Sequence, residues 1–207
     1  MEAMRTERIP LFPLNVVLLP GADLPLHIFE PRYREMVKHC LANNQEFGML
    51  LALPDGIAHV GCTAEIVEVV KRYPDGRMDI LAVGRAPFRV VELFNGNPLL
   101  EASVDYLEDR ESRSDGGGRK QLLELYEACY TLVYGDYPRN TGAELPGHFS
   151  YFVAAMLPMD LLWKQHILEL RTEADRVAQL LAYLRQWAPH LLKTGPLRQS
   201  AGGNGLN

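Results

Sequence analysis

Over the first half of the chain, apolar and polar residues alternate as they do in β-strands. From Leu100 to Tyr106 every second residue is apolar, and Glu101, Ser103 and Asp105 lie between them. A period of two predicts a strand with one buried face. Further strands are predicted over residues 47–53, 63–72, 78–83 and 88–94. The first of these runs is apolar throughout, which is typical of a fully buried strand.

Glycine and proline mark the turns between these strands. Pro74, Asp75 and Gly76 separate two of the runs, and Gly76 can take the positive φ of a hairpin turn. We also predict turns at Gly21 and Gly84, where glycine would supply backbone freedom.

One helix interrupts the strands. Pro31 suits the first helical position, because the missing N–H has no partner there. Asn43 and Asn44 favour the end of the helix. Between these limits five apolar residues recur with helical spacing on one face: Tyr33, Met36, Val37, Cys40 and Leu41.

After residue 120 the apolar positions recur with helical spacing instead. Leu122, Tyr126, Cys129, Tyr130 and Val133 form one such stripe. Further helices are predicted over residues 147–157 and 161–170, the second capped by Asp160. Thr172 and Asp175 resemble a capping box that opens a fourth helix, which we expect to end before Pro189.

The change of period divides the chain. Residues 108–120 contain no apolar side chain and include three consecutive glycines, so we predict a flexible linker there. We assign residues 1–107 to a β-rich subdomain and residues 121–192 to a helical bundle. Residues 193–207 are glycine-rich and are expected to form a disordered tail.

Composition narrows the range of functions. The 207 residues are 47% hydrophobic and 23% charged, which is typical of a globular protein. The formal net charge of -5 argues against a nucleic-acid partner, because phosphate binding uses clustered Lys and Arg. Three cysteines without a C-x-x-C pair indicate a reducing cytoplasm and no zinc site. The sequence has no apolar run long enough to predict a membrane span, and we expect no signal peptide.

A search for catalytic motifs finds no P-loop, dinucleotide fingerprint, H-E-x-x-H or G-x-S-x-G. His39 and Cys40 are adjacent, but neighbours on a helix do not face each other. Cys40 also lies on the apolar stripe, where a structural role is favoured. Glu30, Glu35 and Glu46 have no evident partner carboxylate. We therefore predict no catalytic residue, no metal ligand and no cofactor.

The N-terminal part carries the string L-P-L-H-I-F-E-P-R-Y-R at residues 24–34, after I-P-L-F-P-L at 9–14 and V-L-L-P-G at 17–21. V-G-C-T-A-E-I follows at residues 60–66, and Gly84-Arg85 comes next. The second half contains Leu157-Pro158 and A-D-R at residues 174–176. In this order the segments resemble the Lon N-terminal domain family, over about residues 9–190. That family includes the substrate-binding domain of ATP-dependent Lon proteases, part of cereblon, and small stand-alone proteins.

The resemblance implies an α+β fold, a PUA-like β-barrel with one helix followed by a C-terminal helical bundle. It covers the substrate-recognition part alone, without the ATPase and Ser–Lys protease modules of full Lon proteases. We therefore expect neither ATP hydrolysis nor proteolysis, whatever a name inherited from Lon suggests. Most of the shared prolines and glycines have a structural explanation, so the resemblance does not locate an active site.

Our first functional hypothesis is a non-catalytic module that binds polypeptide segments or a protein partner. The candidate surfaces are the barrel near the first helix and the cleft facing the bundle. Phe29, Arg32, Tyr33 and Arg85 are the candidate binding residues, because aromatic and Arg side chains dominate interaction hot spots. The opposing interpretation places the two aromatic residues in the core and pairs each arginine with a neighbouring acid. RNA binding through the PUA-like fold is the alternative, and a hydrolase assembled in space is the third. The oligomeric state is left open.

Overall fold

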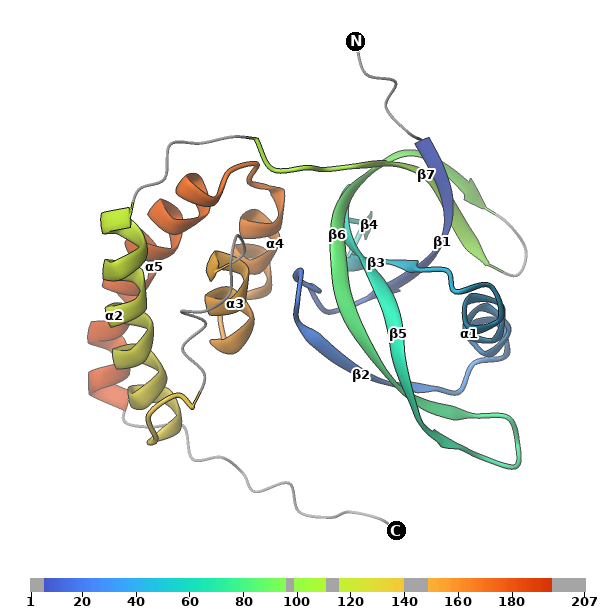
Figure 1. The fold of residues 1–207 in the computed structure, drawn as a ribbon, viewed down its shortest axis with the longest axis horizontal. Coiled ribbons are helices and arrows are strands. Elements are labelled where there is room, and N and C mark those ends of the chain that lie inside the picture. Colours follow the sequence, from blue (N-terminus) through green and yellow to red (C-terminus); the bar gives the residue numbers. More distant parts are fainter. Residues whose placement is uncertain (1–5, 96–98, 111–115, 140–148, 195–207) are drawn as a thin grey trace.

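The computed structural model describes residues 6–95, 99–110, 116–139 and 149–194. A curved sheet, the sheet half, lies beside four helices, the helical half, and a fifth helix packs at the far end of the sheet (Figure 1). The strands are β1 (Thr6–Leu14), β2 (Asp23–Ile28), β3 (Phe47–Leu53), β4 (Gly56–Ile57), β5 (Val60–Arg72), β6 (Met78–Asn95) and β7 (Leu100–Tyr106). The helices are α1 (Pro31–Asn43), α2 (Gly116–Tyr134), α3 (Phe149–Met156), α4 (Leu161–Glu169) and α5 (Glu173–Thr194).

The sheet is mostly antiparallel. Its strand order is β1-β7-β6-β5-β3-β4, and β1 also pairs with β3 in parallel. This last pairing joins five strands in a circuit, while β2 pairs with β6 and β4 pairs with β3 outside it. The sheet is therefore not a clean barrel, and the predicted fold class is met only in part.

The strands predicted over 78–83 and 88–94 form one continuous strand, β6. Gly84 lies inside it, so the turn predicted there is wrong. Its backbone pairs instead with the loop before β2: Gly84 N–H donates to Ala22 O at 3.0 Å, and Gly21 N–H donates to Gly84 O at 2.8 Å. A Cβ at position 84 would overlap the carbonyl oxygen of Leu19, which explains why only glycine fits. Gly21 does occupy a turn with positive φ, as predicted.

Helix α1 follows the sequence pattern closely. Pro31 is its first residue, and Asn44 ends it in the left-handed conformation with a φ of 50°. Tyr33, Met36, Val37 and Cys40 are buried against the sheet half.

Local signals also begin the last two helices. Leu162 N–H donates to Asp160 Oδ1 at 2.8 Å, and Asp175 N–H donates to Thr172 Oγ1 at 3.0 Å, so both predicted caps are present. Helix α5 does not end before Pro189 but continues to Thr194. Pro189 is exposed, so water can replace the backbone hydrogen bond that a proline removes.

The segment predicted as a flexible linker is held in place where the structure describes it. Arg110 N–H donates to Arg171 O at 2.8 Å, and helix α2 already begins at Gly116. The cause lies in Arg176, a fully buried arginine of α5 that needs the Asp109 carboxylate as its counter-charge. Residues 111–115 of this segment, and residues 195–207 of the predicted tail, lie outside the described residues.

The buried guanidinium of Arg176 has several hydrogen-bond partners. Its guanidinium donates to both carboxylate oxygens of Asp109, to Ser150 Oγ at 2.8 Å and to Glu173 Oε2 at 3.0 Å. It also lies 4.2 Å from the centroid of the Tyr151 ring. These contacts tie α3 and α5 to the irregular segment that follows β7.

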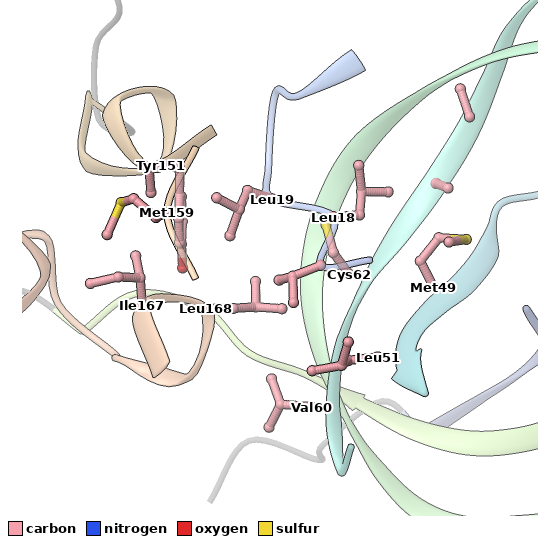
Figure 2. Close-up of a cluster of buried hydrophobic side chains, with 14 of the residues drawn as sticks. Leu18, Leu19, Met49, Leu51, Val60, Cys62, Tyr151, Met159, Ile167 and Leu168 are labelled. Atoms are coloured by element: carbon pink, nitrogen blue, oxygen red, sulfur yellow. The ribbon is translucent and has the colours of Figure 1, made fainter. Parts of the chain in front are cut away.

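The two halves share one apolar core. Leu18 and Leu19, from the loop after β1, lie between Tyr151 and Met159 of the helical half and Cys62 of β5 (Figure 2). All five residues belong to the same cluster of buried hydrophobic side chains. This shared cluster does not test the predicted division into two subdomains, which stays a prediction. Within the described ranges, no helix has the length and hydrophobicity needed to cross a membrane.

Candidate functional site

A groove opens at the junction of the two halves, and we call it the α4 groove. Its volume is about 960 Å³. One wall is the turn from β3 into β4 and the start of β5, and the other is helix α4. The lining residues are Leu51, residues 53–60, Arg89, Leu162, Gln165 and Glu169.

Apolar side chains are exposed on both walls. Leu162 is 66% exposed and Leu53 is 39% exposed, although both are leucines. Leu162, Gln165 and Glu169 are spaced by three and four residues, so α4 presents them on one face. Asp160 fixes the start of that face by capping the helix.

Gln165 bridges the two walls from beneath. Its Nε2 donates to Val60 O at 3.0 Å and to Glu169 Oε1 at 2.8 Å. Both partners are acceptors, so the amide cannot be flipped. The opposite atom, Gln165 Oε1, is buried and has no hydrogen-bond partner among the described residues.

Arginine side chains lie at one end of the groove. Arg89 pairs with Val60 in the register of β5 and β6, and it forms no ion pair with another described residue. Arg171 and Arg110 are joined nearby by a backbone hydrogen bond. Burial lowers the pKa of Arg171, and the positive charges of Arg110 and Arg89 lower it further, while Asp109 opposes them.

The four predicted binding residues lie outside the lining of this groove: Arg32 and Tyr33 on α1, Phe29 between β2 and α1, and Arg85 on β6. Tyr33 is buried and stacks on Phe12 with a centroid distance of 4.0 Å. Arg32 donates to Glu30 at 2.9 Å, and Arg85 donates to Glu65 at 2.5 Å. For these three residues the opposing interpretation, core or ion-paired, describes the structure.

Phe29 is the exception, because it is 59% exposed. Its ring stacks on His27 at 6.0 Å, and His27 in turn contacts Asp79 at 2.5 Å. Phe29 is separated from the α4 groove, whose lining does not include it.

The groove residues have only weak signals in the sequence. Leu162 and Gln165 lie within a predicted helix, but nothing local shows that this face stays open. Val60, which accepts from Gln165, is 105 residues away along the chain. Only the expectation of a cleft facing the helical half pointed toward this region.

The part of the chain that the structure describes has no metal-binding cluster beside the groove. It holds no group of three or more His, Cys, Asp or Glu side chains arranged to bind a metal. All three cysteines are free and buried. Burial raises the pKa of Cys40 and of Cys129 to about 11, so neither thiol is activated as a nucleophile.

Comparison with known proteins adds a family. Residues 8–186 match the ATP-dependent protease La (LON) substrate-binding domain. Lon protease of Dictyoglomus thermophilum is 25% identical over 193 residues, which are 86% of this chain and 24% of that protein. Protein cereblon of Xenopus tropicalis is 36% identical over 92 residues, which are 42% of this chain and 20% of that protein. The chain thus spans about a quarter or less of these relatives.

Solved structures agree. The crystal structure of a Lon N-terminal domain protein from Xanthomonas campestris has a TM-score of 0.66 at 27% identity, covering 86% of this chain and 98% of that chain. The N-terminal domain of Mycobacterium avium complex Lon protease has a TM-score of 0.61 at 17% identity, covering 88% and 98%. At that identity the second likeness supports the fold alone.

Proposed function

Because the chain belongs to the Lon substrate-binding domain family, as its sequence predicted, we propose that it binds polypeptide segments in the α4 groove. The name of the Dictyoglomus thermophilum relative describes a protease, whereas the matched family is a substrate-binding domain. We further propose that this chain is itself non-catalytic and acts in a reducing cytoplasm, in keeping with three free buried cysteines.

The observation that carries the proposal is the pair of exposed leucines on opposite walls of one groove. Leu53 and Leu162 leave apolar surface in water at a place wide enough for a peptide. Full burial of an exposed leucine side chain contributes about 1.5–3 kcal/mol. Leu162 and Leu53 have 66% and 39% of their surface left to cover, so the pair would contribute about as much as one fully buried leucine. An extended segment is the form of chain that suits such a groove.

The test is the binding of a labelled, permanently unfolded polypeptide, reduced and carboxymethylated α-lactalbumin, measured by fluorescence anisotropy. Leu162→Asp should weaken binding about tenfold or more, because a charge replaces the apolar contact. Val70→Asp is the matched control, since Val70 is 60% exposed on β5 and does not line the groove. Its affinity should equal that of the parent chain.

Both variants change an exposed side chain, so we expect their free energies of unfolding to stay within about 0.5 kcal/mol of the parent. Equal binding by all three proteins would show that the α4 groove is not the site. Absence of binding by the parent chain at high micromolar concentration would exclude the function itself.

A further inference from the structure

The charges around the α4 groove are unevenly distributed. Asp55 lies at the tip of the β3–β4 turn, and Arg89 lies beside Val60, beyond the base of that turn. Gln165 Nε2 donates both to Val60 O and to Glu169 Oε1, so the Glu169 carboxylate lies at the same end of the groove as Arg89. The groove therefore has an acidic tip and an arginine end, which holds Arg89 together with Glu169.

The arginine end holds three arginines and one acid of the groove lining, Glu169. Arg110 and Arg171 are adjacent, because Arg110 N–H donates to Arg171 O at 2.8 Å. Asp109, next to Arg110 in the chain, is held by two hydrogen bonds from Arg176. No ion pair joins Arg89, Arg110 or Arg171 to an acid within the ranges that the structure describes.

We propose that the α4 groove selects extended polypeptide segments in which acidic side chains adjoin an apolar stretch, with a carboxylate bound by Arg89 beside Arg110 and Arg171. The inference rests on the proposed function and adds a substrate class to it. A guanidinium binds a carboxylate through paired charge-assisted hydrogen bonds, which gives direction as well as affinity.

The net charge of the chain sharpens this selectivity. At -5 the protein as a whole repels acidic ligands, so attraction is confined to the arginine end of the groove. The apolar part of a segment then lies along Leu53 and Leu162, and the acidic part lies toward Arg89.

The experiment compares two short fluorescein-labelled peptides with the same apolar centre, one followed by glutamates and the other by glutamines. At low salt the full-length chain should bind the glutamate peptide about tenfold more tightly. Added salt should remove most of that difference. A third peptide, with lysines in place of the glutamates, should bind weakest.

Charge reversal tests the assignment to Arg89. Arg89→Glu should lose the preference for glutamate and bind the lysine peptide more tightly than the parent does. Arg72→Glu is the control, because Arg72 is exposed on β5 outside the groove and should leave the preference intact. Denaturation curves of both variants verify that they are folded.

The outcomes separate the two proposals. Equal affinity of the parent for the glutamate and glutamine peptides would overturn the acidic preference and leave the groove function standing. No binding of any peptide would overturn both. If a labelled single-stranded oligouridylate bound more tightly than the glutamate peptide and Arg89→Glu abolished that binding, the arginines would serve RNA and the inference would be wrong.

Discussion

The opening segment, residues 24–34, and the α4 groove differ in how completely their side chains are satisfied. In the opening segment Tyr33 is stacked in the core and Arg32 is paired with Glu30. In the groove Leu162 is exposed, Gln165 Oε1 has no donor among the described residues, and Arg89 has no counter-charge among them. The most recognisable string of the sequence is thus mainly structural, and the less distinctive residues form the open surface.

The largest effect on stability is expected for Tyr33→Ala, in the opening segment. Loss of the ring that stacks on Phe12 should lower the free energy of unfolding by about 3–5 kcal/mol in urea denaturation. Tyr33→Phe keeps the ring and should restore most of the stability. The folded fraction of either variant should bind the unfolded substrate with the parent's affinity. A loss of affinity in Tyr33→Phe would show that the opening segment is part of the binding surface.

Alkaline pH should destabilise the core beneath α1. Burial raises the pKa of Cys40 from 9.0 to about 11, so the folded chain binds its thiol proton more tightly than the unfolded chain does. The resulting stability is fully present below pH 9 and is lost as pH rises toward 11, by up to about 3 kcal/mol. The free energies of unfolding of the parent and of Cys40→Ala, measured by denaturation at a series of pH values, should approach each other as the pH rises from 9 to 11. A constant difference over this range would contradict the prediction.

Gly84→Ala tests the contact between β6 and the loop that carries Leu19. The new Cβ would overlap the Leu19 carbonyl, so we expect a loss of about 1–3 kcal/mol. Gly117→Ala, at an exposed position of α2, should instead raise the stability slightly. Equal effects of the two substitutions would show that the close approach at Gly84 is unimportant.

The smallest effect is expected for Arg85→Ala. Arg85 and Glu65 form an exposed ion pair, and such pairs contribute about 0–1 kcal/mol. We therefore expect a stability within about 0.5 kcal/mol of the parent and unchanged binding of the unfolded substrate. A clear loss of binding would make Arg85 a contact residue after all.

Where the sequence predicted the structure well, the signal was local. Pro31, Asn44, Asp160 and Thr172 each act on a backbone within a few residues, and each helix boundary appears where its cap predicts. Gly84 was predicted less well, because its role depends on the Leu19 carbonyl, which lies far away along the chain.

The candidate site depends even more on distant contacts. Gln165 acquires its role from Val60, and the linker segment is fixed because Asp109 meets a buried Arg176. Neither the amino-acid composition nor the spacing of apolar residues along the sequence reveals such pairings. They also do not show that Leu162 stays exposed while Leu168 of the same helix is buried.

The most direct test of the central claim places a photo-crosslinking residue, p-benzoylphenylalanine, at single exposed positions. Leu162 represents the α4 groove, and Phe29, 59% exposed, represents the opening segment. After irradiation with labelled carboxymethylated α-lactalbumin, the account predicts crosslinks from position 162 and background levels from position 29. Crosslinks from position 29 with none from position 162 would contradict it.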